Sequence, residues 1–188
     1  FMLKQGKNTI GIALGGGGAR GAAHIGVLQL LHNAGIRISQ IAGSSAGAVI
    51  GAMYAATEDP TWIENRFNRF LNSNIFKGLG TDRMIPDRDP HSAISQIAKK
   101  VQDQFILILS LNKSFILKKD KLRNAIDFLL PVKTFEELKI PLHITATDIQ
   151  TGEIQIYSSG DLLEAVVRSA SIPGYIEPTQ SEKKIILE

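Results

Sequence analysis

The sequence predicts an α/β fold with a parallel sheet, because the order strand, Gly-rich turn, helix occurs twice near its start. The first unit joins an apolar run, Thr9 to Leu14, to a helix from Ala19 to about Ala34 that stops at Gly35. The second joins Ile38 to Gly43 to a small-residue helix from Ala46 to Ala56. This alternation is typical of parallel strands with right-handed crossovers, whose active face lies at the carboxyl ends of the strands. Both Gly-rich turns are therefore expected on one face.

Later in the chain, hydrophobic periodicity predicts two more helices and a pair of strands: Thr61 to Leu71, Leu162 to Ala170, and Leu142 to Thr147 with Ile154 to Tyr157. The span Asn74 to Asp89 is rich in Gly, Pro, Asn and Asp and predicts a loop.

Composition places the chain among ordinary folded domains. Its 188 residues are 44% hydrophobic and 21% charged, which fits one globular domain and excludes disordered and fibrous classes. The net charge of +3 is carried by scattered Lys and Arg, so no nucleic-acid partner is expected. The absence of cysteine excludes disulfides, a thiolate nucleophile and a Cys-ligated metal. The first eight residues lack the apolar run of a secretory signal, so we expect a cytoplasmic protein.

The segment Gly43-Ser44-Ser45-Ala46-Gly47 has the spacing of a nucleophile elbow. A hydroxyl is a poor nucleophile, so catalysis needs it projected from a rigid turn, beside a base and facing oxyanion donors. Between a strand and a helix, the flanking Gly43 and Gly47 relieve crowding around a strained serine. Ser45 is the predicted nucleophile, while Ser44 falls outside the spacing and is assigned to packing or capping.

The loop Gly15-Gly16-Gly17-Gly18-Ala19-Arg20-Gly21 follows the first strand and offers successive N–H groups to an anionic oxygen. It also contains G-x-G-x-x-G, which leaves a dinucleotide site as the main alternative. The acidic residue that such a site needs is missing from Ile36 to Gly43, and no Lys-Ser or Lys-Thr supports a P-loop. We predict that Arg20 and Gly21 orient the loop.

Together, Gly16 to Gly21 and Gly43 to Gly47 resemble the patatin-like phospholipase family. The resemblance continues in four more segments: His24 to Leu28, Ala146 to Asp148, Thr151 to Glu153, and Ala165 to Gly174. It implies a three-layer α/β/α sandwich with a mainly parallel sheet, a Ser-Asp dyad without histidine, and hydrolysis of lipid acyl esters without a cofactor or metal. On this chain it implies Ser45 as nucleophile and the N–H groups of Gly16, Gly17 and Gly18 as oxyanion donors.

The family's dyad aspartate begins an Asp-Gly turn, and no Asp-Gly pair occurs in this sequence. The run Ile185 to Glu188 resembles the strand that precedes that turn, so the aspartate is expected just after Glu188. Residues 1–188 are accordingly interpreted as one patatin-like domain, truncated on its C-terminal side. Asp148 is expected to hold its own turn, and Asp161 to cap the following helix.

The four histidines, at positions 24, 32, 91 and 143, are scattered, so each is expected to be structural. The substrate class implied by the resemblance is a lipid or other acyl ester. The apolar stretch Phe105 to Leu117, too short to span a bilayer, is interpreted as buried core, with an acyl groove or a transient contact with a membrane surface as the alternatives. A nucleotide-binding protein and a catalytically silent interaction domain remain the competing functions.

Overall fold

The computed structural model describes residues 9–79, 119–148, 150–171 and 186–187. Its sheet has the order β1 (Thr9–Leu14), β2 (Arg37–Ser44), β3 (Leu142–Asp148) and β4 (Ile154–Tyr157), with the short β5 (Ile186–Leu187) also paired to β3. Strands β1, β2 and β3 are parallel, whereas β4 and β5 run antiparallel to β3. The predicted α/β fold is confirmed, and the carboxyl ends of β1 and β2 lie side by side.

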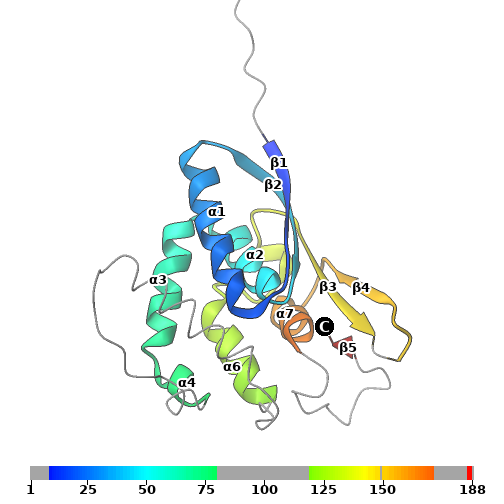
Figure 1. The fold of residues 1–188 in the computed structure, drawn as a ribbon. Helices are drawn as coiled ribbons and strands as arrows, with labels where there is room; N and C mark the ends of the chain where they lie inside the picture. Colours follow the sequence, from blue (N-terminus) through cyan, green and yellow to red (C-terminus); the bar gives the residue numbers. More distant parts are fainter. Residues whose placement is uncertain (1–8, 80–118, 149, 172–185, 188) are drawn as a thin grey trace, which may run out of the picture.

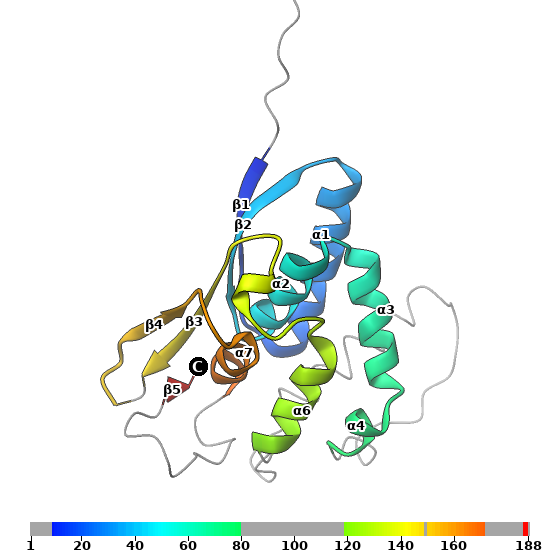
Figure 2. The ribbon, with the colours of Figure 1, turned by 180° about the vertical axis from the view of Figure 1, so that it is seen from behind.

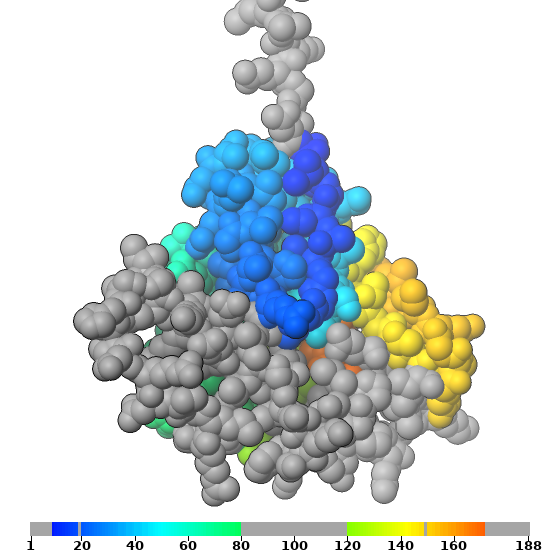
Figure 3. Space-filling view, viewed as in Figure 1, coloured from blue at the N-terminus to red at the C-terminus, as the bar shows by residue number. Residues whose placement is uncertain are grey.

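The described helices gather on one side of the sheet, as Figures 1 and 2 show from opposite directions. They are α1 (Ala22–Asn33), α2 (Ala46–Thr57), α3 (Pro60–Leu71), α4 (Asn74–Lys77), α6 (Lys119–Leu129) and α7 (Leu162–Ala170). A second helical layer is not among the described residues. The β3–β4 pair lies at one side of the molecule (Figure 3), and Ile154 and Ile156 on β4 are 69% and 65% exposed.

Helix α2 is the centre of the helical layer, and its residues Ala46 to Ala56 are all buried. Small residues make this possible, because a Cβ on Gly51 would lie only 3.1 Å from the Ile41 side chain on β2. Bulky residues would hold the helix away from the strands. The helix that begins at the serine turn is therefore seated directly on the sheet.

Polar caps set the starts of two predicted helices. The Asp59 carboxylate accepts hydrogen bonds from the N–H groups of Thr61 (2.9 Å) and Trp62 (3.0 Å), so α3 begins at Pro60. The Asp161 carboxylate accepts from the Glu164 N–H at 2.8 Å, which confirms its predicted role as the cap of α7. These caps explain why α7 begins where the sequence predicted and why α3 begins one residue before its predicted start at Thr61.

The loop predicted from Asn74 to Asp89 is wrong at its start, because Asn74–Lys77 form α4. Ser73 caps this turn by accepting from the Phe76 N–H at 3.2 Å, and the Phe76 ring packs edge-on against Phe70. Residues 80 to 89 of the predicted loop lie outside the described part of the chain, as do Phe105 to Leu117 and His91.

Helix α6 was not predicted. Its buried side chains are Leu122, Ala125, Ile126 and Leu129. Their i, i+3, i+4, i+7 spacing is the signal that could have revealed the helix. The first predicted helix also differs at its start, because Gly18–Gly21 form a 3-10 turn before α1.

Candidate active site

Ser45 occupies the turn between β2 and α2 and has the backbone conformation of a strained elbow. Its φ is 51° and its ψ is −118°, and it is one of two non-glycine residues with positive φ in the described part of the chain. Such a conformation costs about 1–3 kcal/mol and clusters at functional sites. The residue is 2% exposed. The strained backbone that the G-x-S-x-G spacing predicts is therefore found at Ser45.

Close backbone contacts explain the glycines around Ser45. A Cβ on Gly47 would lie 2.0 Å from the Leu14 carbonyl oxygen at the end of β1. A Cβ on Gly43 would lie 2.8 Å from the Ala48 Cα, and one on Gly21 would lie 2.6 Å from the Ala46 Cβ. These approaches leave no room for a side chain, so the two predicted glycine motifs pack against each other.

The glycine loop turns sharply beside the start of α2. Gly17 and Gly18 have φ values of 132° and 60°, and the Arg20 N–H donates to the Gly17 carbonyl at 3.1 Å. In the described part of the chain, the N–H groups of Gly16, Gly17 and Gly18 donate to no protein acceptor. The loop thus presents free donors next to the serine turn.

Arg20 lies within this loop, and His24 follows it in α1. The Arg20 side chain is exposed and makes no hydrogen bond or ion pair to a described residue, so its predicted orienting role stays a prediction. The His24 Nε2 lies 2.9 Å from the Gly15 carbonyl oxygen, which ties α1 to the start of the loop. This bond gives His24 the structural role expected of it. His32 and His143 are exposed, and neither bonds to Ser45.

Asp148 holds its own turn, as predicted. Its Oδ1 accepts hydrogen bonds from the N–H groups of Gln150 (2.9 Å) and Thr151 (3.3 Å), and the Gly152 N–H donates to the Asp148 carbonyl at 2.7 Å. The residue is fully buried, and its Oδ2 has no hydrogen-bond partner among the described residues. No described carboxylate or histidine hydrogen-bonds to the Ser45 hydroxyl. The described residues therefore contain the nucleophile turn and the donor loop without a bonded base.

The family model described as patatin-like phospholipase matches residues 12–187. The chain belongs to the patatin-like phospholipase family. The resemblance noted in the sequence is thereby confirmed, and neither the nucleotide-binding protein nor the silent interaction domain is favoured.

Several known proteins match this chain over most of its length. It is 32% identical over 171 residues to patatin-like phospholipase domain-containing protein ZK370.4 of Caenorhabditis elegans, covering 91% of this chain and 11% of that protein. It is 31% identical over 179 residues to the uncharacterized NTE family protein Mb1092c of Mycobacterium bovis, covering 95% of this chain and 42% of that protein. The structure of VipD from Legionella pneumophila aligns with a TM-score of 0.48 at 16% identity, covering 94% of this chain and 45% of VipD. The chain thus spans less than half the length of these relatives.

One buried contact of this patatin-like site was not foreseen from the sequence. The Ser45 N–H donates to the hydroxyl oxygen of Ser169 on α7 at 2.8 Å, and that hydroxyl donates to the Thr145 carbonyl on β3 at 2.7 Å. Ser169 lies within the family-like segment Ala165 to Gly174, which was the available signal, but nothing local assigns it a role.

The short strand β5 lies in line with the serine turn. Thr147 pairs with Ile154 of β4 and also with Leu187 of β5, so β5 occupies the opposite edge of β3 from β4. Strand β2 pairs with this same edge of β3, where Ser44 lies opposite Thr145. Ile186 pairs with Asp148 and Leu187 with Thr147, so β5 advances along β3 toward Thr145 and therefore toward Ser44.

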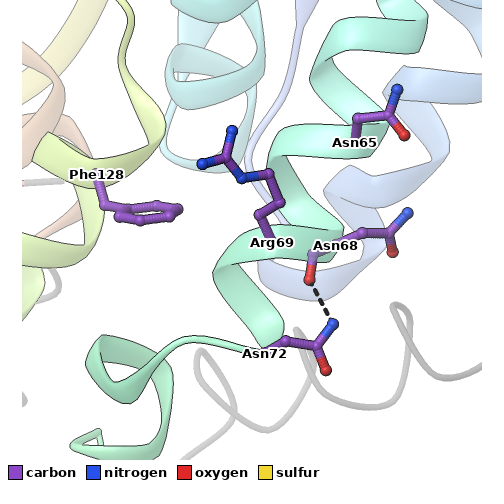
Figure 4. Close-up of a pocket in the computed structure, with 5 residues that line it drawn as sticks. All are labelled: Asn65, Asn68, Arg69, Asn72 and Phe128. Atoms are coloured by element: carbon purple, nitrogen blue, oxygen red, sulfur yellow. Dashed lines mark hydrogen bonds between the residues drawn. The ribbon is translucent and has the colours of Figure 1, made fainter.

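A surface pocket of about 590 Å³ lies between α3 and α6 and is lined by Asn65, Asn68, Arg69, Asn72 and Phe128 (Figure 4). Beside it, the Arg66 guanidinium lies 4.4 Å from the centre of the Phe128 ring, and its Nε donates to the Phe128 carbonyl at 2.8 Å. Burial, and then the charge of Arg69, lower the pKa of Arg66. The pocket shares no residue with the glycine loop or the serine turn. It is a depression between two helices and is separate from the candidate active site.

Two further findings concern metal binding and membrane crossing. Among the described residues, no group of three or more histidine or carboxylate side chains is placed to hold a metal ion. None of the described helices combines the length and the apolar character needed to cross a bilayer.

Proposed function

We propose that this chain carries the nucleophile and the oxyanion hole of a serine acyl hydrolase that acts on lipid acyl esters. The observation that carries the proposal is the strained Ser45 beside glycine N–H groups that donate to no acceptor in the described part of the chain. Membership of a family named for phospholipase activity supports a lipid ester as the substrate class. The whole site lies within one patatin-like domain.

In the proposed reaction, the Ser45 hydroxyl attacks the ester carbonyl carbon while a base takes its proton. The N–H groups of Gly16, Gly17 and Gly18 hold the negative charge that develops on the carbonyl oxygen. The alcohol then leaves with a proton, and water attacks the acyl-serine to release the fatty acid and restore Ser45. Because N–H donors fixed in the turn of the glycine loop need little reorganisation, they stabilise the tetrahedral intermediate more than the ester.

We propose that the base is an aspartate carried by the chain that follows β5. The register supports this assignment, because β5 runs along β3 toward Thr145, the partner of Ser44. A carboxylate shortly after this strand would approach the Ser45 hydroxyl from the edge of the sheet. Asp148 is a poor alternative, since the N–H groups of Gln150 and Thr151 already hold its Oδ1. The reading frame after Glu188 should encode Asp-Gly, and a frame without a carboxylate there would remove the dyad.

Ser45→Ala tests the nucleophile, with Ser44→Ala as the matched control. We expect Ser45→Ala to lower hydrolysis of an acyl ester by at least about a thousandfold and to abolish labelling by a fluorophosphonate probe. Ser44→Ala should keep both the hydrolysis and the labelling, because the Ser44 hydroxyl lies outside the elbow position. Labelling or turnover that survives in folded Ser45→Ala would reject the proposal.

A further inference from the structure

Ser169 is a fully buried hydroxyl whose two hydrogen bonds both leave its own helix. Its Oγ accepts from the Ser45 N–H at 2.8 Å and donates to the Thr145 carbonyl at 2.7 Å. A serine in a helix commonly donates instead to the carbonyl four residues earlier. Ser171 at the end of α7 does so, because its Oγ donates to the Val167 carbonyl at 2.6 Å. Ser169 therefore connects α7 to the serine turn and to β3, whereas the Ser171 hydroxyl bonds only to a carbonyl of α7.

The backbone turn at Ser45 creates the need for this contact. Strands β2 and β3 are paired up to Ser44 and Thr145, and at Ser45 the positive φ takes the chain out of the ladder. A buried N–H without a partner costs about as much as a lost hydrogen bond, and no other described group bonds to this one. The single Ser169 hydroxyl satisfies both the Ser45 N–H and the Thr145 carbonyl.

The contact also affects which groups can take part in the reaction. Because the Ser45 N–H is bonded to Ser169, it is not available to an oxyanion, which leaves that task to the glycine loop. An uncommon backbone conformation persists only when the surrounding structure holds it. We propose that Ser169 is a positioning residue that holds the Ser45 backbone, and with it the nucleophile, in the elbow conformation. This inference rests on the proposed role of Ser45.

Helix α7 is held firmly enough to serve as the anchor. Val166 and Val167 are fully buried, and the Glu164 carboxylate accepts from Arg168 at 3.1 Å on its own helix and from Arg123 of α6 at 2.7 Å. The buried valines and the ion pair with Arg123 hold α7 in the core and against α6. The position of the Ser169 hydroxyl is thus set by packing that does not involve the serine turn.

Ser169→Ala and Ser171→Ala in the full chain form a matched pair. Each removes one buried hydroxyl from the same helix, but only the first removes a bond to Ser45. We expect Ser169→Ala to slow fluorophosphonate labelling of Ser45 and to lower kcat by about 10- to 100-fold, with KM little changed, because small misplacements of a nucleophile have effects of this size. Ser171→Ala should stay within about threefold of wild type in both. Amide hydrogen exchange at Ser45 should accelerate only in Ser169→Ala.

Equal labelling, equal kcat and equal Ser45 exchange in the two folded variants would overturn the inference. If Ser169→Ala does not fold, Ser169→Cys provides the comparison, since a thiol of similar size is a weaker donor and acceptor and should slow labelling to a lesser degree. A wild-type chain that no probe labels would instead contradict the proposed function. In that case the exchange of the Ser45 amide still decides whether Ser169 holds the turn.

Discussion

Replacing Gly47 by alanine should both destabilise the protein and disable the proposed nucleophile. A Cβ at this position would lie 2.0 Å from the Leu14 oxygen, 2.4 Å from the Leu14 carbonyl carbon and 2.8 Å from the Gly15 oxygen. All three are backbone atoms, so none can swing aside as a side chain would. Ordinary contact begins at 3.4 Å. The first turn of α2 must therefore move more than 1 Å away from the end of β1.

The size of the effect follows from this displacement. Overpacking a well-packed interior costs about 1–3 kcal/mol, and here rigid backbone puts the cost at the upper end of that range. Alanine recovers about 1 kcal/mol through its better helix propensity, so we expect a net loss of about 1–2 kcal/mol in the free energy of unfolding. A shift of about 1 Å at Ser45 should also lower the rate of ester hydrolysis by about 100-fold.

Urea denaturation and fluorophosphonate labelling measure the two effects, and Gly51→Ala in the same helix is the control. A Cβ at Gly51 would meet only side chains, at 3.1 Å from Ile41, 3.4 Å from Leu142 and 3.5 Å from Leu14. These side chains can adjust, so Gly51→Ala should be neutral or slightly stabilising and should label normally. A Gly47→Ala protein that is as stable and as reactive as Gly51→Ala would refute the close approach of α2 to β1.

Two further substitutions test the Asp148 turn and the carboxylate of Glu137, which caps the turn after Lys133 and Thr134. Asp148→Asn should keep the turn, because an amide oxygen can still accept from the Gln150 and Thr151 N–H groups, and hydrolysis should stay within a few-fold of wild type. Collapse of hydrolysis in folded Asp148→Asn would instead make Asp148 the base. For Glu137, hydrogen bonds from the Thr134 side chain and from the Lys133 and Thr134 N–H groups lower the pKa below 4.5. The ionised carboxylate therefore stabilises the fold at neutral pH, and this contribution is lost as the pH falls below about 4.5. Glu137→Gln should melt at a lower temperature than wild type at neutral pH, and the two melting temperatures should converge in acid. A difference in melting temperature that is the same at neutral and acid pH would contradict the stabilising role of the ionised carboxylate.

Elements with a strong local signal were predictable from the sequence. The strand β1 and the helix α7 have the predicted bounds, and α3 begins one residue earlier because Pro60 follows the Asp59 cap. In each case the apolar pattern lies within the element and a turn or cap residue lies directly beside it. The short helix α4 was missed because Gly and Asn in this span favour a loop, whereas the buried Phe76 and the Ser73 cap favour a helical turn.

In the candidate site, too, features set by neighbouring residues could be predicted, whereas a contact between distant residues could not. The strained backbone of Ser45 follows from a five-residue spacing, and the sharp turn of Gly17 and Gly18 follows from a run of glycines. The bond from Ser45 to Ser169 joins residues 124 positions apart, and Ser171 two residues on has the same side chain with a different role. No property of the local sequence distinguishes these two serines, because only the docking of α7 on β3 decides which one faces the elbow.

The strain at Ser45 explains why so many segments converge on one turn. A serine at φ 51° carries about 1–3 kcal/mol of backbone strain, and a relaxed turn would gain that energy if nothing opposed it. Three contacts from separate parts of the chain oppose it: Gly47 lies against the Leu14 carbonyl of β1, Gly21 lies against Ala46, and Ser169 of α7 holds the Ser45 N–H. When one of these contacts is lost, the other two still maintain the fold, but the Ser45 side chain is no longer held in its reactive position. Substitutions at these contacts should therefore reduce reactivity by a larger factor than their loss of stability alone would suggest.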